Sequence, residues 1–124
     1  MPLQLNWIDR DSNGNLYSLS TVPLADQYFD NLAGIYIIYY LKDGFVYTVY
    51  VGQGVIKDRL YAHRNDDRIQ AYNSHALYTA WANTSVQNWD GIEKHLHDRL
   101  HPLVGVLSPN ALPISTNLPG VYQQ

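Results

Sequence analysis

Two runs of consecutive apolar residues in the first half of the chain predict a β-hairpin. The runs cover residues 35–41 and 45–51 and are rich in β-branched and aromatic side chains, as buried strands are. Lys42-Asp43-Gly44 between them has the residues of a tight turn, and Gly52-Gln53-Gly54 is expected to end the second strand. This hairpin is the strongest secondary-structure signal in the sequence.

The length of the hairpin loop decides which side chains share a face. A three-residue loop over 42–44, with its glycine in a left-handed bulge position, places Tyr36 directly across from Tyr50. A two-residue loop over 43–44 would oppose Tyr36 to Val51 and send the two tyrosines to opposite faces. We expect the three-residue loop, with both phenols on one face.

The N-terminal segment shows a second, weaker hairpin pattern. Residues 3–7 alternate apolar and polar positions, residues 11–15 are turn-forming Asp, Ser, Asn and Gly, and residues 16–19 are again largely apolar. This order predicts a β-hairpin extension ahead of the main sheet. A short helix over 23–30 is expected to follow it.

Helix-forming residues dominate after the main hairpin. Residues 56–64 predict a helix, on which Arg59 and His63 lie one turn apart on the same face. The further expected elements are a short helix over 67–74, a third strand over 76–82, an N-cap at Thr84-Ser85 and a helix over 86–101. Pro102 stops the last helix, and the Pro-rich and Asn-rich tail predicts extended structure with no further helix.

Composition supports one packed domain. The chain has 124 residues, 46% hydrophobic, 13% aromatic and 15% charged, which is typical of a single globular core and excludes disorder. We expect the α+β class, with a small antiparallel sheet of about three central strands flanked by helices. The expected parts are an N-terminal extension over 1–31, a core over 32–106 and an extended tail over 107–124.

Several classes of protein and site are excluded by residue usage. With no cysteine, disulfides, thiolate zinc sites and a cysteine nucleophile are impossible, which suits a reducing compartment such as the cytoplasm. The sequence has no apolar run long enough to span a membrane and no signal-peptide profile at its N-terminus. We therefore expect a cytoplasmic protein without a membrane partner.

The balance of charge is mildly acidic, so any contact with nucleic acid must be local. Eight basic residues stand against eleven acidic ones, and no general positive field collects phosphates. A modest patch interleaves Lys57, Arg59, Arg64 and Arg68 with Asp58, Asp66 and Asp67. Such a patch can position one phosphate but would not hold long DNA.

Glu93 is the only glutamate in the chain. It lies at the edge of the apolar stripe of the helix over 86–101, with His97 just beyond it. One interpretation is a helix-surface carboxylate that pairs with Lys94 or His97. The other is a functional carboxylate half shielded from water.

The residues of the hairpin and of the two longer helices resemble the GIY-YIG nuclease superfamily. Gly34-Ile35-Tyr36 and Tyr50-Val51-Gly52 are similar to its paired signature, with Val for the usual Ile. In that superfamily an arginine, a histidine or tyrosine one turn later and a metal-binding glutamate follow in this order. These positions match Arg59, His63 and Glu93, and the likeness covers about residues 33–105.

The resemblance implies an endonuclease domain that cleaves DNA phosphodiester bonds with Mg²⁺ or Mn²⁺ held by Glu93. It implies that Arg59 binds a phosphate, that Tyr50 more than Tyr36 helps to deprotonate the attacking water, and that His63 assists or orients. For Arg59 and His63 the alternative is an ordinary solvated helix face, and for the tyrosines it is sheet packing, as at Tyr40 and Tyr47. Further candidates for contact with substrate are Gln53, Lys57 and Arg64.

Three departures from the superfamily keep a second function open. Gln53 follows the second motif where a lysine or another polar residue is common, and Gly105 stands where an asparagine is expected. The first thirty or so residues have no counterpart in the minimal domain. The alternative is a catalytically silent module that binds nucleic acid or protein. In the nuclease case, we expect a separate DNA-binding domain, a subunit or a homodimer partner to supply affinity for DNA.

His97 and His101 have the i,i+4 spacing of zinc ligands. The sequence places no third ligand beside them. A solvent-exposed helix surface is therefore the preferred interpretation of this pair.

Overall fold

The computed structural model describes residues 2–105 and 107–123, and its centre is a three-stranded antiparallel sheet. Strand β1 (Ala33–Lys42) lies between β2 (Phe45–Val55) and β3 (Tyr78–Asn83). The expected α+β class and small antiparallel sheet are confirmed. The expected end of the second strand was wrong, because β2 continues through 52–54 and leads directly into the next helix.

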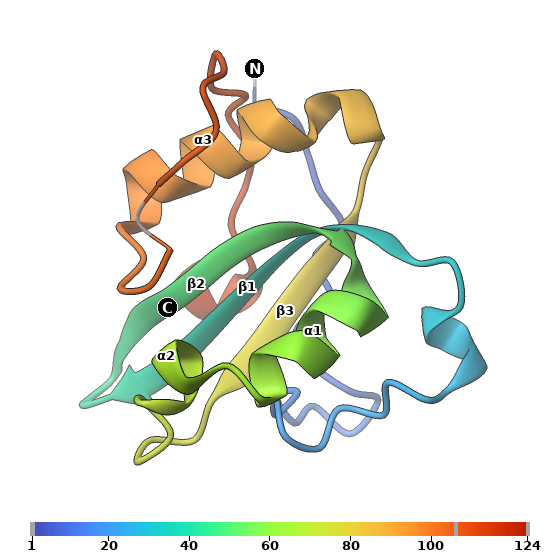
Figure 1. Ribbon diagram of the computed structural model, residues 1–124, viewed down its shortest axis with the longest axis vertical. Helices are drawn as coiled ribbons and strands as arrows, with labels where there is room; N and C mark the ends of the chain where they lie inside the picture. The colour runs from blue at the N-terminus through green and yellow to red at the C-terminus, as the bar shows by residue number, and fades with distance from the viewer. Residues whose placement is uncertain (1, 106, 124) are drawn as a thin grey trace.

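Helices cover both faces of the sheet (Figure 1). Helix α1 (Ile56–Arg64) and the short α2 (Asp67–Gln70) lie on one face, and α3 (Trp89–Leu100) lies on the other. The expected helices over 56–64 and 86–101 are confirmed, except that the second begins as a 3₁₀ turn, η2 (Val86–Asn88). Within residues 2–105 and 107–123, no helix combines the length and the apolar character needed to cross a membrane.

Two short helical turns differ from the expectations. The predicted helix over 23–30 is reduced to a 3₁₀ turn, η1 (Gln27–Phe29), capped by the carboxylate of Asp26. The tail was expected to contain no helix, but it ends in a 3₁₀ turn, η3 (Gly120–Gln123), which buries Val121. That burial provides the hydrophobic contact that orders the turn.

The core has two parts, one on each face of the sheet. Alternate residues of β1 point to opposite faces, so Tyr36 and Ile38 pack with α1, whereas Ile35 and Ile37 pack with α3. Burial on both faces explains why β1 is an uninterrupted apolar run rather than an alternating one.

The register of the main hairpin differs from the predicted one. The loop has two residues, Asp43 and Gly44, with φ of 53° and 82°, which is the backbone of a tight two-residue turn. A β-bulge in β2 at Val49 then shifts the pairing, so that Tyr36 faces Gly52 and Tyr50 faces Ile38. The three-residue loop and the direct pairing of the tyrosines were therefore wrong.

The two tyrosines nevertheless lie on one face, for a reason that the sequence did not show. A two-residue loop alone would place the two side chains on opposite faces of the sheet. The bulge adds one residue to β2, which turns Tyr50 back to the face of Tyr36. The rings of Tyr36 and Tyr50 stack with centroids 6.1 Å apart and planes 19° apart.

The N-terminal segment reverses direction as predicted but does not form an independent hairpin. Its arms are joined at one bridge, Arg10 with Leu16, and by the flanking backbone hydrogen bonds of Tyr17 N to Asp9 O and Asp11 N to Asn15 O, and both arms also pair with the edge of β3. Backbone hydrogen bonds join Ile8 to Trp81 and Tyr17 to Thr79. An unpaired strand edge is a site of aggregation, and this segment covers it.

Candidate active site

Tyr36, His63 and Arg59 form one hydrogen-bonded group between β1 and α1. The hydroxyl of Tyr36 lies 2.6 Å from His63 Nε2, and Arg59 Nε donates to the same hydroxyl at 3.4 Å. Arg59 and His63 are one helical turn apart, so α1 presents both to a single phenol. The sequence-based expectation that these residues share one face of the helix agrees with this geometry.

Gly52 makes room for the phenol. A Cβ atom at this position would lie 2.4 Å from the Tyr36 hydroxyl oxygen, far inside van der Waals contact. Because Gly52 is the cross-strand partner of Tyr36, the ring can lie flat over β2 and reach α1. The glycine of the second motif therefore has a steric role in assembling the group.

Tyr50 completes the group from the edge strand. Its ring centroid lies 4.5 Å from that of His63, and it is partly exposed, whereas Tyr36 is fully buried. Among the residues that the sequence analysis proposed as catalytic, Tyr36, Tyr50, Arg59 and His63 thus come together on the α1 face of the sheet.

Burial sets the protonation of the buried pair. Desolvation raises the pKa of the Tyr36 phenol, although the hydrogen bond and charge of Arg59 act in the opposite direction. Burial, followed by the positive charge of Arg59, lowers the pKa of His63 to about 4. At neutral pH, Tyr36 therefore carries its proton and His63 is an uncharged imidazole.

Asp66 helps to select the histidine tautomer. Its Oδ2 lies 3.9 Å from His63 Nδ1, and a negative oxygen at this distance favours the proton on Nδ1. Nε2 then carries the lone pair and accepts from the Tyr36 hydroxyl. Asp66 was not among the sequence-based candidates, although its i,i+3 spacing from His63 is a typical helix pairing distance.

Glu93 lies on the opposite face of the sheet from the hydrogen-bonded group, against the edge strand β2. Helix α3 packs on the face opposite to α1, so Glu93 is not in the hydrogen-bonded group itself. Its carboxylate accepts from Gln53 Nε2 at 3.1 Å, and the same amide donates to Asp90 at 2.9 Å. Gln53 belongs to the edge strand, so this contact holds the carboxylate beside β2.

The charge of Arg59 acts on groups of both faces, on Tyr36 and on Glu93. The pKa of Glu93 is raised, mainly because the side chain is buried, and the positive charge of Arg59 acts to lower it. The aliphatic part of Arg59 passes over Gly54, where a Cβ would lie only 3.3 Å from Arg59 Cγ. Gly54 thus allows the Arg59 side chain to pass close to the end of β2.

Glu93 and His97 are more buried than the sequence suggested. Glu93 is 9% exposed rather than half in water. His97 is buried as well, with Nε2 3.5 Å from Glu93 Oε2, so its assignment to a solvent-exposed surface was wrong. Of the interpretation as a helix-surface carboxylate paired with Lys94 or His97, the structure has the contact with His97 but not the surface position, and Lys94 pairs with Asp98 instead.

The three proposed substrate-binding side chains lie in different places. Gln53 contacts Glu93 and Asp90, as described above. Lys57 lies in the first turn of α1 and pairs with Asp30 at 3.4 Å on the surface.

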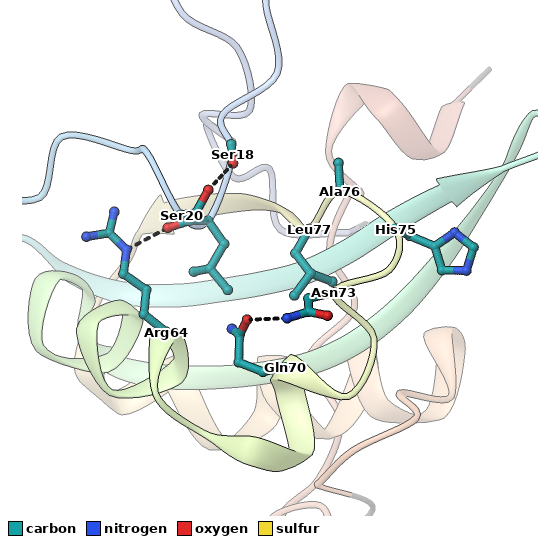
Figure 2. A pocket seen from close by; sticks show the side chains of 9 residues that line it. Ser18, Ser20, Arg64, Gln70, Asn73, His75, Ala76 and Leu77 are labelled. Atoms are coloured by element: carbon teal, nitrogen blue, oxygen red, sulfur yellow. Dashed lines mark hydrogen bonds between the residues drawn. The ribbon is translucent and has the colours of Figure 1, made fainter.

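Arg64 has a structural contact instead of an open position near the site. Its guanidinium donates to the carbonyl oxygens of Leu19 and Val22 at 2.7 and 2.6 Å. Figure 2 shows it at the side of a hollow of about 270 Å³. The lining residues are Ser18, Leu19, Ser20, Arg64, Gln70, Asn73, His75, Ala76 and Leu77.

The carboxylates near Gln53 suit a loosely held hard cation. Mg²⁺ is commonly bound by one or two carboxylates and several waters, and Glu93 and Asp90 meet at one amide group. No set of three or more His, Asp or Glu side chains arranged for a metal occurs within residues 2–105 and 107–123. Glu93 and Asp90 are therefore the two carboxylates here that could contribute to holding a cation, with water or substrate as the remaining ligands.

Comparisons of the chain with protein-family models, with curated proteins and with solved structures find no match.

The low pKa of His63 predicts a specific dependence of stability on pH. The folded-state pKa of about 4 lies below the usual value of 6.5, so the native state disfavours the charged ring. The contribution of the neutral His63 ring to the unfolding free energy is therefore complete above pH 6.5. This contribution is lost as the pH falls toward 4. Between pH 7 and pH 4.5 the parent should lose roughly 2 kcal/mol more unfolding free energy than His63→Gln.

Urea unfolding at both pH values measures this difference. His75→Gln provides the matched control, because it makes the same change at a second histidine outside the group. Equal losses in the parent and in His63→Gln would show that His63 is protonated in the native protein at pH 4.5.

Proposed function

We propose that the chain is a divalent-metal-dependent endonuclease domain of the GIY-YIG type, which cleaves DNA phosphodiester bonds. The observation that supports this most is the contact of one phenol, Tyr36, with both His63 and Arg59, beside the partly exposed Tyr50. A phosphodiesterase needs a cation for the phosphate, a path for a proton and a metal-binding carboxylate. Arg59, the partly exposed Tyr50 and Glu93 are the candidates for these roles in turn.

Arg59 is the phosphate-binding group in this proposal. Its guanidinium has five N–H donors in a planar fork, so the bond from Nε to Tyr36 leaves donors for phosphate oxygens. The buried phenol holds the fork in one orientation, which reduces the entropy lost when a phosphate binds.

Tyr50 accepts the proton of the attacking water in this proposal, while its own hydroxyl proton passes to solvent on its exposed side. Tyr50 is partly exposed and can contact the water, whereas Tyr36 is fully buried and acts by orienting Arg59 and His63. His63 is neutral at pH 7 and accepts a hydrogen bond from the Tyr36 hydroxyl, so its role in this proposal is to orient that phenol beside Arg59 and Tyr50. A bound Mg²⁺ or Mn²⁺ at Glu93 would add positive charge near the non-bridging and leaving oxygens.

Nicking of supercoiled plasmid with Mn²⁺ tests the proposal. Tyr50→Phe removes the hydroxyl but keeps the ring, and it is expected to slow nicking by about 10²- to 10⁴-fold, which is the usual contribution of a general acid or base. Tyr61→Phe, the same change at an exposed tyrosine of α1, should nick at the parental rate. A parent that does not nick any DNA with Mg²⁺ or Mn²⁺, or a Tyr50→Phe variant as fast as the parent, would contradict it.

The proposed partner is DNA, and the affinity of the isolated domain is expected to be low. The formal net charge is −3, and several basic side chains are already paired with carboxylates, including Lys57, Arg68 and Lys94. We infer that a separate DNA-binding domain, another subunit or a second copy of the chain holds the substrate, and that the protein acts in the cytoplasm.

The second candidate function is a catalytically silent module that binds nucleic acid or protein. It is favoured by Gly105, where the superfamily has an asparagine. A Cβ at this position would lie 2.6 Å from the ring of Tyr50, so the glycine allows the segment after α3 to pack directly on that ring. In this case the parent would bind DNA or a protein partner without nicking plasmid under any metal condition.

A further inference from the structure

Aromatic side chains form a row along one face of the edge strand β2. Phe45 and Tyr47 lie near the hairpin loop, and Tyr50 lies farther along. Residues 47 and 50 would normally point to opposite faces. The bulge at Val49 brings Tyr50 onto the face of Tyr47, so that the rings lie on the same face of β2 as the candidate active site.

Tyr47 is also the outer member of a stack of rings that runs across the strands, from β2 over β1. Tyr47 stacks on its cross-strand partner Tyr40 with centroids 5.0 Å and planes 8° apart, and Tyr40 stacks on His75 at 4.4 Å and 9°. The side of Tyr47 away from Tyr40 faces the outer edge of β2, along which the segment after α3 pairs with the next two residues through Leu103 N to Thr48 O and Val104 N to Val49 O. Tyr47 is 39% exposed and Phe45 is 68% exposed.

We propose that Phe45 and Tyr47 bind unpaired bases of a DNA strand whose phosphate lies at Arg59. This inference rests on the proposed function and identifies its substrate class as DNA with a single-stranded segment beside the cleaved bond. Bases stack on aromatic side chains without sequence preference, and a parallel stack that ends on an open ring can accept one more ring. Tyr47 and Tyr50 are about 10 Å apart along β2, or roughly three stacked nucleotides.

The charge of the chain agrees with stacking as the main source of affinity. Long-range attraction to phosphates is weak in a chain of net charge −3. Lys42, which pairs with Phe45 across the hairpin and is exposed, places a single cation beside the row. Binding of a single strand should therefore depend less on salt than binding by a basic protein does.

Fluorescence anisotropy of a short labelled oligothymidine, measured in EDTA so that no cleavage occurs, tests the proposal. The parent should bind the single strand more tightly than a blunt duplex. Tyr47→Ala should weaken binding of the single strand by roughly 5- to 100-fold, the range for the loss of one base–aromatic stack. Phe45→Ala should act in the same direction.

Two conservative variants separate stacking from simple apolar contact. Tyr47→Phe keeps the ring and should bind as the parent does, whereas Tyr47→Leu keeps an apolar side chain without a π face and should bind as weakly as Tyr47→Ala. Tyr61→Ala, at a tyrosine of similar exposure on α1 (41%), is the matched control and should bind normally. Thermal unfolding of each variant shows whether it is folded.

The outcomes distinguish this proposal from the proposed function. If the parent nicks DNA but Tyr47→Ala and Tyr47→Leu bind the single strand normally, the stacking proposal is wrong and the nuclease stands. If the parent does not nick DNA but binding depends on the ring of Tyr47, the stacking site stands and the nuclease is wrong. A parent that prefers the duplex or binds no single strand also contradicts the stacking proposal.

Discussion

Replacing Glu93 by glutamine is expected to slow DNA cleavage by at least about 10²-fold. The amide has nearly the same volume as the carboxylate but lacks the negative charge that would hold a divalent cation. Nicking of supercoiled plasmid with Mn²⁺ measures the loss. Asp98→Asn makes the same kind of change on the exposed side of α3, where Asp98 pairs with Lys94, and should leave the rate unchanged.

The same variant should fold as well as the parent. Burial raises the pKa of Glu93, which means that the ionised side chain opposes folding at neutral pH in the absence of a cation. Glutamine keeps an oxygen that can accept from Gln53 and has an amide that can donate to His97 Nε2. The unfolding free energy without metal should stay within about 1 kcal/mol of the parent or rise slightly.

Two results would contradict this account of Glu93. A variant that unfolds several degrees earlier than the parent would show that the carboxylate stabilises the fold through its contact with His97. A variant that nicks DNA at the parental rate would show that the metal is held by other groups or is not needed.

Gly34→Ala is expected to have the largest effect on stability. A Cβ at this position would lie 2.0 Å from the carbonyl oxygen of Ala82 in β3. The obstacle is backbone in a central strand, so a rotamer change cannot relieve it, and β1 and β3 must separate locally. We expect a loss of about 3 kcal/mol or more in unfolding free energy and a fall in Tm of roughly 10 °C.

Gly120→Ala is the control for this variant. A Cβ there would meet Asp9 Oδ2 at 3.6 Å, which is ordinary contact, and the unfolding temperature should remain close to that of the parent. Calorimetry of both variants measures the difference. If Gly34→Ala unfolds at the parental temperature, the close approach of β1 to β3 at this position is incorrect.

The elements that could be predicted are those whose signal is local. Helix α1 follows from the helix propensity of its own residues, and the one-turn spacing of Arg59 and His63 follows from helix geometry. Strand β1 was predictable because a long β-branched and aromatic run is buried wherever it is placed. The position of Glu93 at the edge of the apolar stripe of α3 could likewise be predicted, because it follows from the 3.6-residue period of a helix.

The register of the hairpin could not be predicted from the hairpin alone. The bulge at Val49 leaves backbone groups on the outer edge of β2, and the segment after α3 satisfies them. Leu103 N donates to Thr48 O at 3.1 Å, and Val104 N donates to Val49 O at 2.8 Å. Because these partners are more than fifty residues away in the sequence, loop rules gave the wrong register, although the shared face of Tyr36 and Tyr50 was expected.

The sequence by itself determined the fold class, the order of the main elements and the residue types available for phosphate chemistry, because these depend on periodicity, turn residues and composition. Tertiary structure decided the contact of Tyr36 with His63, the approach of Glu93 to β2 through Gln53, and the burial of His97. It also decided the low pKa of His63, since desolvation comes from every segment packed around the ring. These contacts, the burial and the pKa shift depend on residues that are distant in the sequence and become neighbours only in the folded chain. A local pattern of residues therefore cannot predict them.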